Sequence, residues 1–438
     1  MSKRRLTVRS LRSGPVVVPR HRIRKDLIAS LPQELVNLII DNLKHNYRSL
    51  LSCSLVCRAF VSRTREIPFR RIFLSSGAIC NKLLLLPTST LVCIKSLQMI
   101  YSILGGTQSV LNHPAFPQLM TQFGPLRLTL GHLPWSQLNG GARWALSTHS
   151  FRNIKLEQST FPSVADLCDF LRGSHELDTL ILEDLEIEDT FVPSSYSHDQ
   201  KGASVSRLRL RAHNKESSIF KTIIDARVCP VSFDKLCDLD VTISSAEELV
   251  TLQNALEKLD TLKTLKISHI LYDSHDGPLP RPRLNLKTVH HLKLQLHDFH
   301  NTTSPTVHAD LFEWWYEVWA TTKVTSMEEL SIKTYFESRW DDGYDVAVWS
   351  KIVTALSRPA WARLSELLII IDADEYDLGQ DLYPYRDAIL CAIKNSSMDV
   401  WVEVEYPAVH YEPDEAMYSG SEDEREDEDV GYSDLDDW

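Results

Sequence analysis

The stretch LCDLDVTISSAEELVTLQNALEKLDTLKTLKIS, residues 236–268, contains one complete unit of the pattern that decides this fold. Apolar residues alternate with polar ones at 239–243 and again at 265–267, which predicts two short strands. The segment between them, residues 246–259, has the apolar spacing of a helix. The unit therefore predicts a strand, a helix and a second strand that begins 26 residues after the first.

Ten strands of this kind recur along the chain. The first seven begin at intervals of 26 to 31 residues, and the last three are spaced more widely. Strand-and-helix units of this length are the signature of a leucine-rich solenoid. Each unit has an apolar face that only its neighbours cover, so the units are expected to stack with strands on a concave wall and helices on a convex wall. The expected strands are residues 126–130, 154–156, 180–182, 208–210, 239–243, 265–267, 292–296, 330–332, 367–371 and 400–404.

The sequence thus predicts an α/β fold with an irregular leucine-rich-repeat-like solenoid over residues 75–411. It is irregular because the Asn or Cys that closes each strand in the regular repeat is mostly missing. A second helix is expected at 344–356. Polar stretches rich in Gly, Pro, Ser and Asp predict loops at 186–206, 272–285 and 300–307.

A helical hairpin is expected before the solenoid, at residues 27–74. Its first helix is expected to start at Ser30, with Gln33 as the reciprocal capping partner and Pro32 in the first turn. Its second helix is expected from about Arg48 to Arg65. Fewer than fifty residues have too little interior to cover two apolar stripes, so one stripe is expected to face a partner protein. On the first helix, Leu35, Leu38, Ile39 and Leu43 form one stripe, and Val36 and Ile40 form a second. On the second helix, Leu50, Cys53, Cys57 and Phe60 line one side, and Leu51 and Leu55 lie on the adjacent side. The spacing leaves open which stripe faces outward.

The same residues resemble a known family. LPQELVNLII at 31–40, LLSCSLVCRAF at 50–60 and REIPFRRI at 65–72 are similar to an F-box, although Phe60 and Phe69 stand where the family usually has Trp. The resemblance implies a substrate-recruiting subunit that docks on the Skp-type adaptor of a cullin-RING ubiquitin ligase. Degenerate leucine-rich repeats often follow an F-box, as the repeats do here. The adaptor-contacting residues that the resemblance implies are Leu31, Pro32, Leu35, Ile39, Leu43, Leu50, Leu51, Val56, Cys57 and Phe60.

The polar residues of the strands predict a mildly basic concave wall. Side chains alternate between the two faces of a strand, so the residues between the leucines point outward. Such a wall favours an acidic or phosphorylated protein substrate, although any solvated strand face also carries Lys and Arg. The outward basic residues are Arg127, Lys155, Arg207, Arg209, Arg211, Lys266, Lys293 and Lys333, and the outward acidic ones are Glu157, Glu183 and Asp240.

Charge is segregated at the two ends of the chain. The net charge of −12 resides in residues 412–438, which hold 13 acidic residues and one Arg, whereas the first 25 residues hold nine Lys or Arg and no acid. Residues 1–26 are expected to form a disordered arm, either simply solvated or serving nuclear import, and 412–438 a disordered tail. The tail is either a solubilising extension or a competitor of substrate for the basic wall.

Catalytic motifs are missing from the sequence. It has no Gly-rich phosphate loop, no nucleophile elbow and no zinc-protease motif, and its eight cysteines make no C-x-x-C pair. No apolar run spans a bilayer. We therefore expect a non-enzymatic protein of the cytoplasm or nucleus, without metal or cofactor. The alternatives are a leucine-rich scaffold with no link to ubiquitin and, with less support, a nucleic-acid-binding protein that uses its basic arm.

One aromatic run, at 311–319, has two interpretations. Phe312, Trp315, Tyr316 and Trp319 fall on one face of a helix. Packing against the core is the ordinary explanation for such a face. An exposed anchor for substrate is the alternative, because Trp and Tyr dominate binding hot spots.

Overall fold

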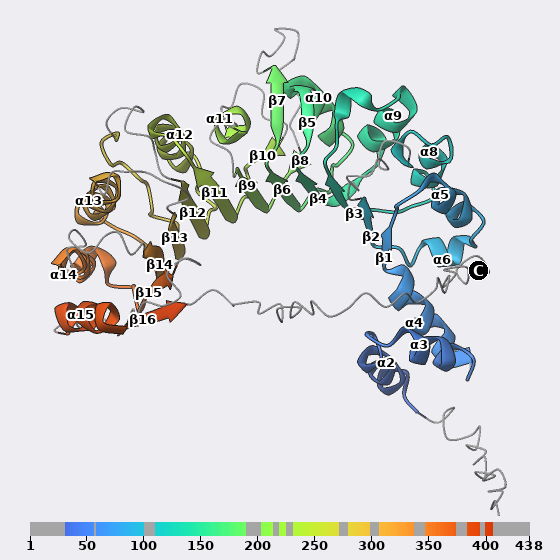
Figure 1. The fold of residues 1–438 in the computed structure, drawn as a ribbon, viewed down its shortest axis with the longest axis horizontal. Helices are drawn as coiled ribbons and strands as arrows, with labels where there is room; N and C mark the ends of the chain where they lie inside the picture. The colour runs from blue at the N-terminus through green and yellow to red at the C-terminus, as the bar shows by residue number, and fades with distance from the viewer. Residues whose placement is uncertain are drawn as a thin grey trace, which may run out of the picture.

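A computed structural model describes residues 31–56, 58–99, 110–189, 203–212, 219–224, 231–270, 279–297, 306–336, 347–373, 383–394 and 399–405. Its main feature is a twelve-stranded sheet in which every neighbouring pair is parallel. The order is β1-β2-β3-β4-β6-β9-β11-β12-β13-β14-β15-β16, so each strand lies beside the next strand of the sheet along the chain. The sheet curves into an arch with strands on its inner side and helices on its outer side (Figure 1).

All ten predicted strands are confirmed. They are β3 (Leu126–Gly131), β4 (Phe151–Glu157), β6 (Thr179–Glu183), β9 (Arg207–Arg211), β11 (Asp238–Ile243), β12 (Thr264–Ile270), β13 (His291–His297), β14 (Glu329–Phe336), β15 (Glu366–Ala373) and β16 (Asp399–Glu405). Two further strands, β1 (Arg71–Phe73) and β2 (Ser96–Met99), extend the sheet toward the N-terminus. These two strands were not predicted, because three or four residues are too short to show an alternation.

Helices cover the outer face of the sheet between successive strands (Figure 1). The predicted helix 246–259 is confirmed as α12 (Ala246–Leu256), and the predicted helix 344–356 as α14 (Ala347–Leu356). The structure is therefore the predicted α/β, leucine-rich-repeat-like array of strand-and-helix units. The other outer helices are α5 (Gly77–Leu84), α6 (Thr88–Leu91), α8 (Ala115–Met120), α9 (Gly140–Thr148), α10 (Val164–Leu171), α11 (Ile219–Ile224), α13 (Thr306–Thr321) and α15 (Tyr383–Ile393).

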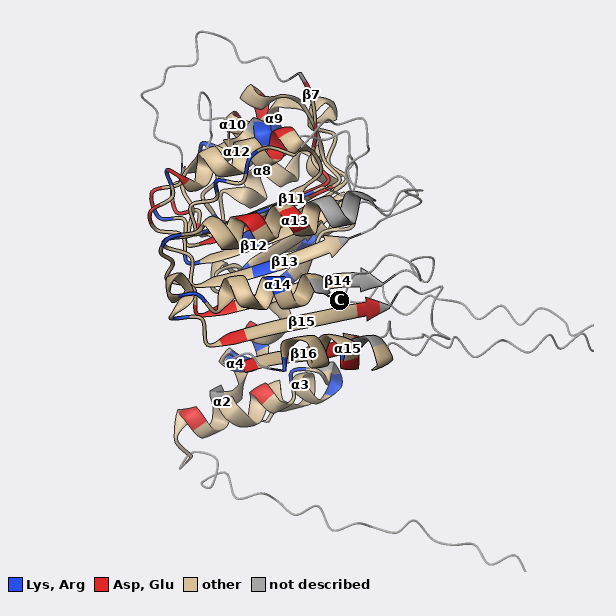
Figure 2. Cartoon of the chain, turned by 90° about the vertical axis from the view of Figure 1, so that its left-hand side faces the viewer, with Lys and Arg blue, Asp and Glu red and all other residues tan. Residues whose placement is uncertain are grey.

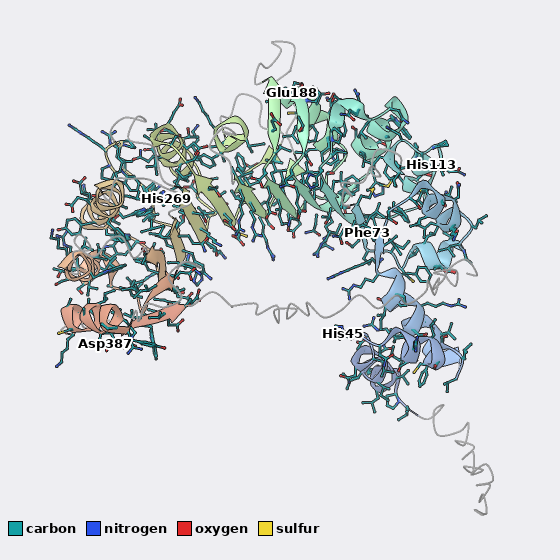
Figure 3. The ribbon with its side chains drawn as sticks, in the orientation of Figure 1. His45, Phe73, His113, Glu188, His269 and Asp387 are labelled. Atoms are coloured by element: carbon teal, nitrogen blue, oxygen red, sulfur yellow. The ribbon has the colours of Figure 1, made fainter. Side chains whose placement is uncertain are left out.

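One continuous core lies between the sheet and these helices, as Figure 3 shows with His269 among its side chains. A ladder of aliphatic residues in one register runs across the strands and forms the sheet side of this core. Because each rung packs on its neighbours, no unit is complete alone. The ladder is Leu97, Leu128, Ile154, Leu180, Leu208, Leu239, Leu265, Leu292, Leu330, Leu367 and Val400.

The aromatic run belongs to this core. Phe312, Trp315 and Trp319 on α13 are between 0% and 4% exposed, so packing explains them and the alternative of an exposed anchor is wrong. The indole Nε1–H of Trp315 donates a hydrogen bond to Nε2 of buried His269, 3.1 Å away. This bond links α13 to β12 across the core.

Three consecutive units leave the concave wall by the same turn. His132, Gln158 and Asp184, the residues directly after β3, β4 and β6, have φ between 45° and 51°. Each donates its backbone N–H to the last carbonyl of the next strand, for example His132 N to Glu157 O at 2.8 Å. The bond satisfies a backbone donor at the strand end and offsets the strain of about 1 kcal/mol or more that this conformation costs a non-glycine residue.

The predicted loop 186–206 is partly wrong. β7 (Glu186–Asp189) pairs with β5 (Thr160–Ser163), and β8 (Ala203–Ser204) pairs with β10 (Val231–Ser232), in two small parallel sheets. β7 and β8 are only four and two residues long, too short for an alternation to show in a polar stretch. In the predicted loop 272–285, residues 279–285 are free of helix and strand, as expected.

The predicted hairpin consists of three short helices rather than two, and it lies beyond the β1 end of the arch (Figure 1). They are α2 (Gln33–Asn42), α3 (Tyr47–Ser54) and α4 (Arg58–Phe69). The expected second helix is interrupted after Ser54. α2 begins at Gln33 with Pro32 as its N-cap and no side-chain cap, whereas Ser30 lies outside the described residues, as do Cys57, the basic arm and the acidic tail.

Among the helices of the described ranges, none is both long enough and apolar enough to cross a bilayer.

Candidate functional site

The three-helix unit at residues 31–69 has a small core of its own. Val36 and Ile40 on α2, Leu50 on α3 and Phe60 on α4 are at most 8% exposed and pack together, separately from the core of the solenoid. Leu43, Cys53 and Ile67 close the edge of this core. Of the two stripes predicted for the first helix, the one with Val36 and Ile40 is therefore the inner one, and it is covered within the unit itself.

The outer stripe remains in contact with solvent. Leu35, Leu38 and Ile39 on one side of α2 are 47%, 60% and 46% exposed. Leu51 and Leu55, one turn apart at the end of α3, are 43% and 88% exposed. Of the 16 large apolar side chains that are exposed in the described residues, ten lie between residues 31 and 92. Seven of those ten belong to this unit and are named the docking surface below: Leu31, Leu35, Leu38, Ile39, Leu51, Leu55 and Val56.

The residues implied as adaptor contacts divide into three groups. Leu31, Pro32, Leu35, Ile39, Leu51 and Val56 are exposed. Leu43 is half-buried, and Leu50 and Phe60 lie in the small core, where they support the docking surface from beneath and have almost no surface for a contact. Cys57 lies outside the described residues. Leu38 and Leu55 were missing from the implied contacts, although the helical spacing placed each of them on an apolar stripe.

An ion pair links α2 to α4. Arg63 donates two hydrogen bonds to the carboxylate of Asp41, from Nε at 2.8 Å and from Nη2 at 2.9 Å, and a third to Glu66 at 2.8 Å. The hydrogen bond from Arg63 holds the pKa of Asp41 below its ordinary value. The bidentate geometry makes this pair stronger than a single surface contact.

Replacing Arg63 with Met is expected to destabilise the three-helix unit by up to about 1 kcal/mol at pH 7, because solvent screens this partly exposed pair. The lowered pKa of Asp41 means that the pair stabilises the fold above the unfolded value of 3.8 and is lost as the pH falls through the folded value. Hydrogen exchange of the α2 amides at pH 7 and below pH 3 measures this difference. If Arg63→Met changed the exchange of the α2 amides equally at both pH values, the Asp41–Arg63 pair would not be the cause.

The concave wall is less basic at β4 and β14 than the sequence suggests. Lys155 lies between Glu157 and Glu183, with its Nζ 2.8 Å from Glu183. Lys333 is 2.8 Å from Asp372 and 2.6 Å from Glu405. Each of these lysines faces two carboxylates and adds no net positive charge to the wall.

The basic surplus lies in the centre of the wall, on β9, β11, β12 and β13. Arg209, Asp240, Lys266 and Lys293 follow one another in a single register across these strands. Asp240 is 5% exposed, and its Oδ2 accepts from Arg209 Nε at 2.9 Å and from Arg211 Nη2 at 3.0 Å. Arg209 Nη1 also lies 4.0 Å from Glu183 on β6, and Asp238 stands opposite Arg207. The outward face of β9, β11, β12 and β13 still carries more cations than carboxylates: Arg207, Arg209, Arg211, Lys266 and Lys293 against Asp238 and Asp240.

Lys266 reports on this central cluster. Burial lowers the pKa of Lys266, an effect that Asp240 opposes and that nearby Arg211 and Arg209 increase. Lys293 also lowers the pKa of Lys266. The exposed Arg207 and Lys293 border the cluster, and Arg127 is exposed three sheet neighbours away on β3. A group of cations that repel one another favours an anionic ligand, which relieves the repulsion.

At its C-terminal end the wall carries apolar and acidic side chains instead of basic ones. Trp401 is 60% exposed on β16, beside the half-buried Leu368 on β15. Glu366 and Asp399 are paired two residues earlier on the same strands, and Figure 2 shows acidic residues at both ends of β15. The alternation of Val400, Trp401 and Val402 already places Trp401 outward, but only charged residues were predicted as contacts on this face.

In the described part of the chain, no group of three or more His, Cys, Asp or Glu residues is arranged to hold a metal ion. No protein-family model matches the sequence, and no curated protein matches it.

Proposed function

We propose that this chain is the substrate-recognition subunit of a cullin-RING ubiquitin ligase, in which residues 31–69 dock on a Skp-type adaptor and the concave wall binds substrate. The docking surface carries this proposal, because it leaves seven large apolar side chains exposed on a unit of three short helices. Apolar patches of this kind mark protein-interaction sites. The resemblance of the same residues to an F-box supplies the identity of the proposed partner.

In this proposal the chain performs no bond chemistry. Its role is to hold a substrate next to ubiquitin loaded on another subunit, which converts a bimolecular encounter into a nearly intramolecular one. An arch with the three-helix unit at one end suits this role, because the adaptor would bind that unit and the substrate the concave wall (Figure 1).

Co-purification tests the proposal. The full chain, tagged and expressed in cells whose proteasomes are inhibited, is expected to bring down a Skp-type adaptor and a cullin. Recovery of other partners without these two would support the alternative, a leucine-rich scaffold with no link to ubiquitin.

The proposed substrate segment for the central cluster is acidic or phosphorylated. Reversing Arg207 and Lys293 to Glu is expected to weaken binding of a fluorescent phosphoserine peptide about tenfold or more, since charge-assisted hydrogen bonds are replaced by repulsion. Fluorescence anisotropy at low and high salt measures this loss, which shrinks as salt screens the charges. These two residues are exposed, whereas reversing Arg209 or Arg211 would put a second carboxylate against buried Asp240 and unfold the wall.

The matched control reverses Lys258 and Lys287, which are also exposed and lie outside the strands. It keeps the net charge of the test variant and is expected to bind the peptide like the unmodified chain. Equal losses in both variants would mean that only the overall charge matters, and the central cluster would then not be the binding site.

A further inference from the structure

The last three strands of the concave wall differ from the centre in both charge and polarity. Outward residues in one register are Lys293 on β13, Ser331 on β14, Leu368 on β15 and Trp401 on β16. Along this register the outward residue therefore changes from a cation on β13 to an apolar pair on β15 and β16. Ile370, two residues after Leu368, is also half-buried on the same face and extends the apolar pair.

Carboxylates border this apolar group on two sides. Glu366 and Asp399 stand opposite each other two residues before Leu368 and Trp401, and Glu403 stands two residues after Trp401. All three are exposed, and no ion pair is formed by them with the described residues. In contrast, Asp372 and Glu405 are both satisfied by Lys333.

We propose that this surface, formed by Trp401, Leu368, Ile370, Glu366, Asp399 and Glu403 and named the aromatic–acidic patch, binds a cationic segment of the protein substrate. The open face of Trp401 suits a guanidinium or ammonium group, because the ring quadrupole attracts a cation. The flanking carboxylates accept the charge-assisted hydrogen bonds that such a group donates. Leu368 and Ile370 contact its aliphatic stem, as long basic side chains require.

The distance to the central cluster sets the spacing of the substrate. Neighbouring strands lie about 4.8 Å apart, so Lys293 and Trp401 are separated by about 14 Å across the sheet. An extended peptide advances about 3.3 Å per residue, so about four residues bridge the two sites. The inference rests on the proposed function and deepens it: the substrate segment carries an anionic residue and, about four positions away, an Arg or Lys.

Synthetic peptides test this inference on the full chain by fluorescence anisotropy. The probe contains one phosphoserine and one Arg with a neighbouring Leu, and three Gly or Ser residues separate the phosphoserine from the Arg, which is therefore four positions away. It is synthesised in both orders, so that either direction of binding is tested. One of the two orders is expected to bind about tenfold tighter than the same peptide with Gln in place of Arg. Lengthening the spacer by four residues is expected to reduce this gain.

Two variants assign the gain to the patch. Trp401→Ala is expected to abolish the preference for Arg over Gln, and so is the triple variant Glu366→Gln, Asp399→Asn, Glu403→Gln. Trp144→Ala is the matched control, since Trp144 is 57% exposed and lies on the outer helix α9. An unchanged preference in Trp401→Ala, or no preference in the unmodified chain, would overturn the inference.

Other occupants of the patch give different results. Tighter binding of the Arg peptide after the nine cations of residues 1–25 are replaced by Gln would assign the patch to the chain's own arm. Self-association that Trp401→Ala removes would assign it to a second copy. Either result would overturn the inference. Adaptor co-purification does not depend on Trp401, so a failure of this inference and a failure of the proposed function are distinguishable.

Discussion

Replacing Leu35 and Ile39 together with Lys is expected to abolish binding to a Skp-type adaptor, with a loss in affinity of about a hundredfold or more. Both side chains are nearly half exposed on α2, so lysine at either position keeps its charge in water in the free chain. In the complex the same charges would be buried without a partner, which is costly. The measurement is a pull-down with purified adaptor, followed by a titration of the surviving affinity.

The fold of this variant is expected to be unchanged, because Val36 and Ile40 form the inner side of the same helix and are not altered. Far-UV circular dichroism and the melting temperature check this. Val250→Lys on α12 is the matched control, since Val250 is 41% exposed on a helix outside the three-helix unit. Full adaptor binding by the Leu35 and Ile39 variant would show that this side of α2 is not the docking surface.

Replacing Trp315 with Ala is expected to cost about 3–5 kcal/mol of the free energy of unfolding, as for other large aromatic residues in a core. Trp315 is 0% exposed, and its ring centroid lies 5.1 Å from that of Trp314 and 5.7 Å from that of Trp319. The change also removes the hydrogen bond to His269, which joins α13 to β12. Urea denaturation monitored by hydrogen exchange measures the loss in the strands around β13 and β14.

This destabilisation is expected to spare the three-helix unit, because the small core of that unit is separate from the core that contains Trp315. Adaptor binding at low urea concentration therefore stays intact in Trp315→Ala. The control is Trp144→Ala, an exposed tryptophan whose removal is expected to change stability by less than about 0.5 kcal/mol. Equal losses in the two variants would contradict the packing described for α13.

The ten main strands were predictable because each has its aliphatic residues at alternate positions, and this alternation has a direct physical cause in the two faces of a strand. β1 and β2 were not, because a strand of three or four residues owes its place to the neighbouring strand that it pairs with rather than to its own pattern. β5, β7, β8 and β10 are similar cases outside the main sheet.

The candidate sites were predictable only in part. The alternation of side chains along a strand correctly placed Lys155 and Lys333 on the outward face. Their ion pairs, however, depend on which residues of adjacent strands share a register. The burial of Asp240 has the same origin, since two arginines from the neighbouring strand cover it. In the three-helix unit, helical spacing separated the two apolar stripes of α2 but did not show which of them faces solvent, because that depends on how the helices pack. The interruption after Ser54 was not evident from spacing either.

Calorimetric titration of the purified full chain with a Skp-type adaptor, repeated at several temperatures, measures directly whether the adaptor covers the docking surface. We expect a one-to-one complex with a negative heat-capacity change, which is the mark of apolar surface buried on binding. The Leu35 and Ile39 variant is expected to give no heat of binding. Absence of binding by the unmodified chain, or binding without a negative heat-capacity change, would contradict the claim that the exposed leucines of α2 and α3 are covered by the adaptor.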